Sequence, residues 1–267
     1  MNEKEIIGII KSTVSVGVTE SIGHRSSMED THLTVTKLNT SKNDGVEKSF
    51  FAVFDGHGGS DGSNLARETV EEIVIENLNL DKQPEEALRD TFHQIDKGIE
   101  DSGFPYGCTA ASVLLEGNSL TVANVGDTRV LLIKLGEGEE TAQRISKDHT
   151  LSDEEEVERV KATGAQIARG RIMVGNVGIN VVRALGDKFF GEAVSADPTV
   201  SKQILAPGKY RVVLECDGVW QAVPDEDLAK LITGKNPKDA TEALVKKAND
   251  DWVNDNFTAI VVDIEIF

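Results

Sequence analysis

Three aspartates in this sequence stand where a strand pattern meets a turn, a position that suits a metal ligand. Asp55 follows the apolar run 50–54, Asp217 follows a second apolar run at 212–214, and Asp255 directly precedes an alternating apolar segment. If these strands are neighbours, the three carboxylates converge at one end of a sheet. Carboxylate oxygens suit Mg²⁺ or Mn²⁺ better than zinc.

The turn after Asp55 adds further chemistry to this candidate site. Gly56 offers a carbonyl oxygen as another ligand, and His57 can move a proton near neutral pH. Gly58 and Gly59 follow, and glycines let a backbone turn sharply and approach a ligand closely. The segment therefore predicts a site at the tip of a buried strand.

Two other turns concentrate charge. The turn at 23–30 contains Arg25, Glu29 and Asp30, and its composition alone favours a charged, solvent-exposed hairpin over a binding site. Asp127 lies in a Gly-Asp-Thr turn between two strand patterns. It is either an ordinary turn aspartate or a further ligand.

The overall charge excludes some partners. The chain has 267 residues, a net charge of −18 and an isoelectric point near 4.7. Nucleic acids and anionic membranes both require a basic face, so neither is an expected partner. An anionic substrate would need local positive charge, which bound divalent cations can supply.

Two cysteines, Cys108 and Cys216, are too few for a disulfide framework in a chain of this length. We expect two structural thiols and a reducing compartment, the cytoplasm or the nucleus. Leu114 and Ala222 stand where a Cys-x5-Arg phosphatase motif would need arginine. Residues 1–12 lack the pattern of a signal peptide, and no window has the length of a membrane span.

The hydrophobic patterns predict an α+β fold in a single domain over residues 1–267, because no linker divides the chain. Alternating or apolar runs predict strands within 14–18, 33–35, 50–54, 109–115, 120–124, 129–135, 210–215 and 257–264. Apolar stripes and capping residues predict helices within 66–78, 84–99, 152–164, 224–232 and 239–249. The irregular stretch at about 150–195 is interpreted as an excursion that borders the site.

Several motifs together resemble the metal-dependent type 2C serine/threonine protein phosphatase family, over about 14–266. The segments, in family order, are Arg25 with Met28-Glu29-Asp30, Asp55-Gly56-His57-Gly58-Gly59, Gly107-Cys108-Thr109-Ala110, Gly126-Asp127-Thr128-Arg129, Arg183-Ala184-Leu185-Gly186-Asp187, Cys216-Asp217-Gly218-Val219-Trp220 and Asp255-Asn256. The resemblance implies a four-layer α-β-β-α sandwich, in which two antiparallel sheets are flanked by helices and a two-metal site lies at one end.

The resemblance also implies the ligands of the two ions, Mg²⁺ or Mn²⁺. Asp55 would bridge both ions, the Gly56 carbonyl would bind one, and Asp217 and Asp255 would bind the other. A water bridging the ions would then attack the phosphate directly, with no covalent phosphoenzyme.

Other residues would act on the substrate or on water. By the same resemblance, Arg25 would hold the substrate phosphate, and Glu29 and Asp30 would order waters around the metals. His57 would be the general acid that protonates the leaving alkoxide.

The sequence departs from the family pattern at two positions. Gln221 stands where the family has an aspartate that helps to hold a third, weaker ion beside Asp127, so we expect this third site to be impaired. Val182 stands where the family favours Ser or Thr. It lies in the excursion expected to influence substrate choice.

The leading interpretation is a monomeric phosphoprotein phosphatase that acts on phosphoserine and phosphothreonine. A pseudophosphatase that uses the same fold as a binding module is the alternative, and Gln221 is its best support. A metal-dependent nuclease would also use convergent carboxylates, but the acidic charge disfavours it.

Overall fold

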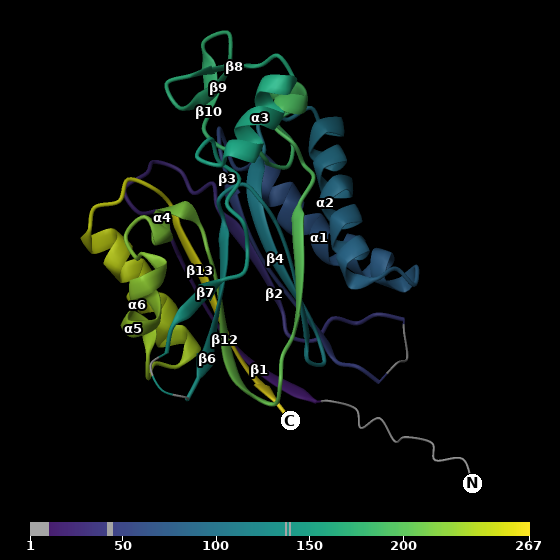
Figure 1. Cartoon of the computed structure of the whole chain (residues 1–267), viewed down its shortest axis with the longest axis vertical. Coiled ribbons are helices and arrows are strands. Elements are labelled where there is room, and N and C mark those ends of the chain that lie inside the picture. Colours follow the sequence, from purple (N-terminus) through teal and green to yellow (C-terminus); the bar gives the residue numbers. More distant parts are fainter. Residues whose placement is uncertain (1–10, 42–44, 137, 139) are drawn as a thin grey trace.

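Two five-stranded antiparallel sheets form the centre of the computed structural model, which describes residues 11–41, 45–136, 138 and 140–267 (Figure 1). The first sheet has the order β1 (Ser12–Ser21), β13 (Phe257–Ile266), β12 (Gly208–Glu215), β6 (Arg129–Leu135) and β7 (Ala142–Arg144). The second has the order β11 (Thr199–Ile204), β5 (Ser119–Val125), β4 (Cys108–Glu116), β3 (Lys48–Gly56) and β2 (Thr31–Val35).

Helices cover the outer faces of both sheets. The helices α1 (Asp61–Asn79) and α2 (Pro84–Asp101) pack on the second sheet, and α5 (Asp225–Ile232) and α6 (Pro237–Asp250) pack on the first. Figure 1 shows the resulting order of layers. The predicted α+β class and the four-layer α-β-β-α sandwich are confirmed.

The apolar run of β3 is explained by burial on both faces. Phe51 and Val53 belong to the core between the two sheets, whereas Phe50, Ala52 and Phe54 belong to the core beneath α1 and α2. A strand that is covered on both sides needs apolar residues at every position rather than at alternate ones. This burial holds the end of β3, and therefore Asp55, in a rigid setting.

Long-range pairing joins the two ends of the described chain. β1 lies antiparallel to β13 over its whole length, from Ser12 opposite Ile266 to Ser21 opposite Phe257. The hydrophobic patterns predict both strands but not this pairing. The strand β11, which pairs with the edge of β5, was not predicted from the sequence.

The stretch at about 150–195 contains more regular structure than its irregular pattern indicates. It includes α3 (Glu154–Ala162), a sheet of β8 (Gln166–Ala168), β9 (Arg171–Val174) and β10 (Val177–Ile179), and the 3₁₀ segment η1 (Lys188–Ala193). Figure 1 shows these elements at one end of the sandwich. Val182 is fully buried in their small core, which accounts for an apolar residue at this position.

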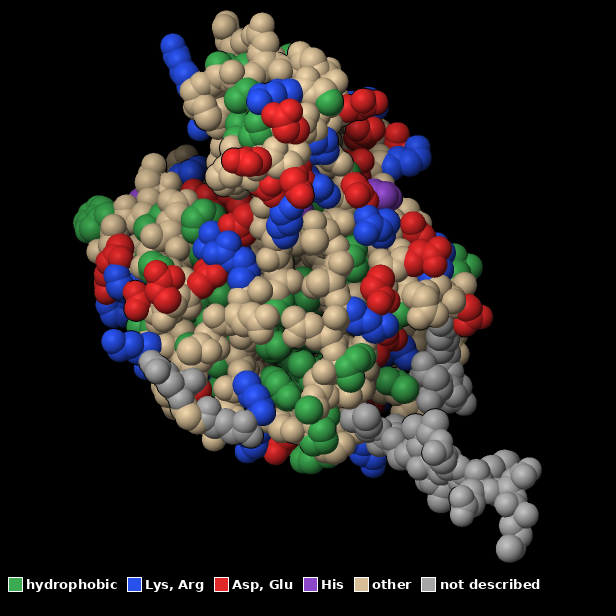
Figure 2. Space-filling model, in the orientation of Figure 1, with side chains coloured by type: hydrophobic (Ala, Val, Ile, Leu, Met, Phe, Trp, Pro, Cys, Tyr) green, Lys and Arg blue, Asp and Glu red, His purple; other side chains and the backbone are tan. Residues whose placement is uncertain are grey.

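Charge is mixed over the face seen in Figure 2, where Asp and Glu side chains alternate with Lys and Arg. No helix of the described residues is long and apolar enough to span a membrane. The expectation about a signal peptide falls mainly on residues 1–10, which lie outside the described part of the chain.

Candidate metal centre

The ends of strands from both sheets bring the three predicted aspartates together. Asp55 lies at the end of β3, Asp217 directly follows β12 at the start of the short helix α4 (Asp217–Trp220), and Asp255 lies just before β13. All three line one cavity of about 360 Å³. The cavity therefore lies at the common end of the two sheets.

The same cavity contains nearly all other candidate site residues. Its lining includes, besides the three aspartates, the predicted residues Arg25, Glu29, Gly56, His57 and Asp127. Asp30 is the exception. It is buried behind the lining, and its Oδ2 accepts a hydrogen bond from Thr258 Oγ1 at 2.8 Å.

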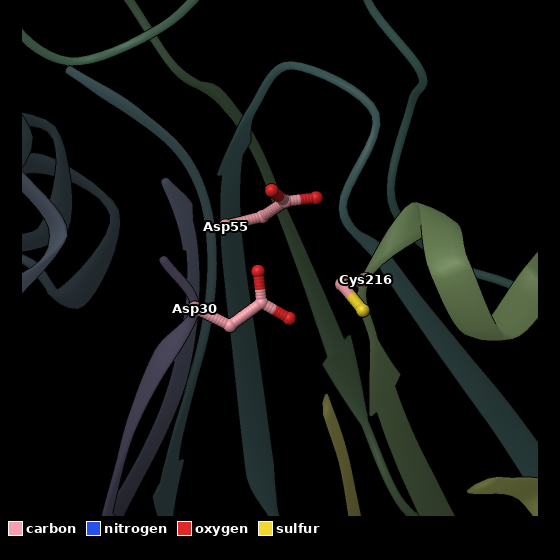
Figure 3. Close-up of side chains that lie close together, drawn as sticks. All are labelled: Asp30, Asp55 and Cys216. Atoms are coloured by element: carbon pink, nitrogen blue, oxygen red, sulfur yellow. The ribbon is translucent and has the colours of Figure 1, made fainter. Parts of the chain in front are cut away.

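Among the described residues, one compact group of possible ligand atoms differs from the predicted set. Carboxylate oxygens of Asp30 and Asp55 and the sulfur of Cys216 lie within 4.8 Å of one another (Figure 3). Burial raises the pKa of the Cys216 thiol well above its usual value, so this group stays protonated. Its Sγ donates to Asn256 O at 3.5 Å, which is the behaviour of a structural thiol.

Burial and mutual repulsion shift the acids of this site. Burial, opposed by a hydrogen bond from Thr258, raises the pKa of Asp30 to about 7. Burial and the nearby charge of Asp217 raise the pKa of Asp127 to about 7. Burial and Asp255 raise the pKa of Asp217 to about 6, although a hydrogen bond with Asp55 lowers it in part.

Burial also raises the pKa of Asp55 itself, and the charges of Asp30, Asp217 and Asp127 raise it further. Such a group of acids is unfavourable when every member is ionised, and it needs either protons or cations to balance its charge. Its donors are hard oxygens, which suit Mg²⁺ and Mn²⁺. The residues present therefore fit a divalent metal centre.

Two glycines allow the backbones around these acids to come close together. A Cβ added to Gly56 would lie 2.3 Å from the carbonyl oxygen of Glu29, and one added to Gly218 would lie 2.1 Å from that of Asn256. Both distances are shorter than any real contact of a Cβ atom. The glycines that follow Asp55 and Asp217 are thus required by packing.

The side chain of Arg25 lines the cavity and contacts Asp255. Its Nη2 donates to Asp255 Oδ2 at 2.9 Å, and its Nε donates to the carbonyl of Asn254 at 2.7 Å. These bonds use two of the five N–H donors of the guanidinium group. Its side chain remains 44% exposed, which is compatible with contact to a substrate.

Asn256 holds the charged turn in place, a role that sequence reasoning did not assign. Its Oδ1 accepts from the amide of Glu29 at 2.8 Å, and its Nδ2 donates to the carbonyls of Ile22 and Ser27. The Glu29 carboxylate accepts from Gly59 N at 3.1 Å. The turn is therefore bound to both sheets, although residues 24–27 are exposed, as a charged surface hairpin would be.

Asp187 is a second residue whose role the sequence did not reveal. Its Oδ2 lies 2.7 Å from His57 Nε2, although 130 positions separate the two residues. The Asp187 side chain is buried, and its backbone has a positive φ of 46°, which is uncommon for a residue other than glycine. Its place in the segment 183–187, already singled out as a motif, was the available signal.

Gln221 contacts the predicted ligand Asp217. Its Nε2 donates to Asp217 Oδ2 at 2.9 Å. An amide thus stands where a carboxylate would add negative charge beside Asp217. Asp127 lies nearby, in the cavity lining, with its side chain almost fully buried.

The fold and the cluster of hard-oxygen donors define the class of a metal-dependent enzyme. The model of the protein phosphatase 2C family matches residues 14–257. Protein phosphatase 2C homolog 1 of Saccharomyces cerevisiae is 33% identical over 274 residues, which cover 94% of this chain and 93% of the yeast protein.

Two further proteins show the same relationship. Probable protein phosphatase 2C 52 of Oryza sativa subsp. japonica is 31% identical, and the match covers 94% of this chain but 51% of the rice protein. The crystal structure of serine-threonine phosphatase 2C from Toxoplasma gondii superposes with a TM-score of 0.78 at 20% identity, over 94% of this chain and 95% of that one. The last comparison shows a shared fold.

The chain belongs to the protein phosphatase 2C family. It is a protein serine/threonine phosphatase of a metal-dependent class. The resemblance stated from the separate motifs is confirmed.

The raised pKa values predict an unusual dependence of stability on pH. Asp30 and Asp127 have folded pKa values of about 7, above the ordinary value of 3.8, so the folded state binds their protons more tightly. Their stabilising contribution is complete below about pH 4 and is lost as the pH rises through about 7. Without metal, the free energy of unfolding should therefore increase by about 1 to 2 kcal/mol per pH unit on going from about pH 8 to about pH 6.5.

Saturating Mg²⁺ should flatten this dependence, because cations then balance the charge that protons balance otherwise. Urea unfolding at several pH values, with chelator and with Mg²⁺, measures both slopes. Burial raises the pKa of Glu215 to about 8. This residue should contribute the same pH dependence to the unfolding free energy with chelator as with Mg²⁺. Identical slopes with and without Mg²⁺ would show that the acids of the cavity do not bind the metal.

Proposed function

We propose that this chain hydrolyses phosphoserine and phosphothreonine in proteins by direct attack of water on the phosphorus. The observation that carries the proposal is the convergence of Asp55, Asp217 and Asp255 on one cavity that Arg25 and His57 also line. Membership of the protein phosphatase 2C family supports it. An acidic cluster alone would repel a phosphate, so the proposal requires bound cations.

Four groups would hold two metal ions. Asp55 would contact both ions, the Gly56 carbonyl would contact one, and Asp217 and Asp255 would contact the other. Two Mg²⁺ or Mn²⁺ ions bound there would supply an activated water nucleophile at neutral pH and would neutralise charge on the phosphoryl group.

Arg25 would bind the phosphate of the substrate. Its planar guanidinium can donate two parallel hydrogen bonds to phosphate oxygens, which a lysine ammonium cannot reproduce. The contact with Asp255 keeps the guanidinium at the rim of the cavity. Glu29 and Asp30 would accept hydrogen bonds from water and so orient it in the site.

His57 would protonate the serine or threonine alkoxide as it leaves. Nε2 lies against Asp187, so Nδ1 is the nitrogen that remains to donate a proton to the substrate. Asp187 would accept a hydrogen bond from Nε2 and restrict the rotation of the ring. It therefore serves as a positioning residue for His57.

We further propose that residues 1–267 act as a single catalytic domain in which about 150–195 form a flap. Arg171 and the segment 177–181 line the catalytic cavity, which supports a role of this region in substrate contact. Cys108 and Cys216 are both buried free thiols, which is compatible with a monomer in a reducing compartment, the cytoplasm or the nucleus.

A third ion is not part of this proposal, because Gln221 places an amide beside Asp217. Gln221→Asp should create a weak additional site together with Asp127, since a carboxylate would replace a neutral donor. Titration calorimetry with Mn²⁺ should then show one more bound ion per chain in the variant than in the wild type. A third ion in the wild type that disappears in Asp127→Asn would contradict the account.

Metal dependence tests the proposed function directly. Hydrolysis of a phosphothreonine peptide in Mn²⁺ should stop on addition of a chelator, and Asp217→Asn should lower kcat/KM by about 10³-fold or more while the fold is retained. Asp250→Asn, at an exposed position of α6, is the matched control and should keep full activity. Turnover that a chelator does not affect would refute the proposal, and no turnover at all would favour the binding module.

The role of His57 depends on the leaving group. His57→Ala should slow a phosphoserine peptide by about 10²- to 10⁴-fold but should slow p-nitrophenyl phosphate much less, because nitrophenolate leaves without a proton. Asp187→Asn should show the same selective loss at a smaller magnitude. His93→Ala, at an exposed position of α2, is the control. Equal losses on both substrates would remove His57 from the role of general acid.

A further inference from the structure

A second hollow, about 430 Å³ in volume, adjoins the catalytic cavity. It is lined by Phe104, Pro105, Tyr106, Val177, Lys188 and Phe189. Tyr106 and Val177 also line the catalytic cavity, so the two spaces are direct neighbours. We call the second space the apolar pocket.

Tyr106 forms the wall between the two spaces. A Cβ added to Gly58 would lie 2.3 Å from Cδ2 of the Tyr106 ring, so the ring is packed directly on this glycine. Gly58 follows His57 in the turn that carries Asp55 and Gly56. The apolar pocket therefore begins at the turn that supplies the candidate metal ligands and the candidate general acid.

Phe189 and Phe190 place one aromatic ring in each space. The two rings pack edge to face with their centroids 5.4 Å apart. Phe190 is buried and lines the catalytic cavity, whereas Phe189 lines the apolar pocket and is 52% exposed. A half-exposed phenylalanine at the mouth of a site gains stabilisation when a ligand covers it.

The chemistry of the lining restricts what the apolar pocket can bind. Among the described residues that line it there is no aspartate or glutamate, and the only charged one is Lys188, which pairs with Glu100 at 3.3 Å. Such a lining cannot neutralise an arginine or lysine of a ligand. It can remove an aliphatic or aromatic side chain from water.

We propose that the apolar pocket binds an apolar side chain of the phosphoprotein substrate, one or two positions from the phosphorylated residue. This inference rests on the proposed function, because it assumes that the phosphorylated residue enters the catalytic cavity. An extended chain advances about 3.3 to 3.6 Å per residue, so near neighbours of the phosphorylated residue must lie on the rim. The net charge of −18 alone would favour basic substrates, whereas the apolar pocket selects a hydrophobic neighbour.

Matched phosphothreonine peptides test this inference. One peptide has serine at the two positions on each side of phosphothreonine, and four others have a single leucine at one of these positions. We expect leucine at one of these four positions to raise kcat/KM about tenfold, which is the effect of burying most of one aliphatic side chain. Phe189→Ser should abolish the preference, and Phe189→Leu should preserve most of it.

Leu80→Ser is the control, because Leu80 is another exposed large apolar residue, next to the end of α1 and outside the lining of both cavities. It should keep the preference of the wild type. The same peptides, with a non-hydrolysable phosphonate in place of the phosphate ester, are compared in parallel by fluorescence anisotropy in Mg²⁺. This second readout measures binding without any turnover.

The two readouts separate failure of this inference from failure of the proposed function. Turnover without any leucine preference, or with a preference that Phe189→Ser leaves intact, would overturn the inference and leave the proposed function standing. A Phe189-dependent leucine preference in binding without turnover would retain the apolar pocket and refute the enzymatic role. Loss of both turnover and preference would overturn both.

Discussion

Repulsion among buried carboxylates is the constraint on which the rest of this structure depends. Burial raises the pKa values of Asp30, Asp55, Asp127 and Asp217, and the charge of a neighbouring acid, Asp217 or Asp255, raises each of them further. Without other interactions, this repulsion would drive the carboxylates apart. Packing elsewhere must therefore hold them together, and the unbalanced charge creates an affinity for protons or for divalent cations.

The sandwich supplies that packing by ending both sheets at the same place. The apolar core between the sheets holds β3 against β12 and β13, so the acids at their ends cannot move apart without opening the core. Asn256 then binds the turn of Arg25 and Glu29 across this end through three hydrogen bonds. The favourable packing of the core thus offsets the repulsion among the carboxylates of the site. Because these carboxylates stay close together, they can bind divalent cations.

Local patterns predicted what depends on local physics. The double-sided burial of β3 and the start of α2 at Pro84 follow from runs of neighbouring residues, and so did the positions of Asp55 and Asp217 at strand ends. The pairing of β1 with β13, the strand β11 and the contact between His57 and Asp187 were not predictable in this way. These features depend on which distant segments pack against one another, and the packing of the whole core determines that.

The central claim is that the acids at the sheet ends enclose two hard cations. A crystal structure of the protein in Mn²⁺, with anomalous scattering to locate the metal, tests it most directly. The account predicts two anomalous peaks in the catalytic cavity, both next to Asp55, one beside the Gly56 carbonyl and the other beside Asp217 and Asp255. A single ion held between Asp30, Asp55 and Cys216, or no ion in the cavity at saturating Mn²⁺, would contradict it.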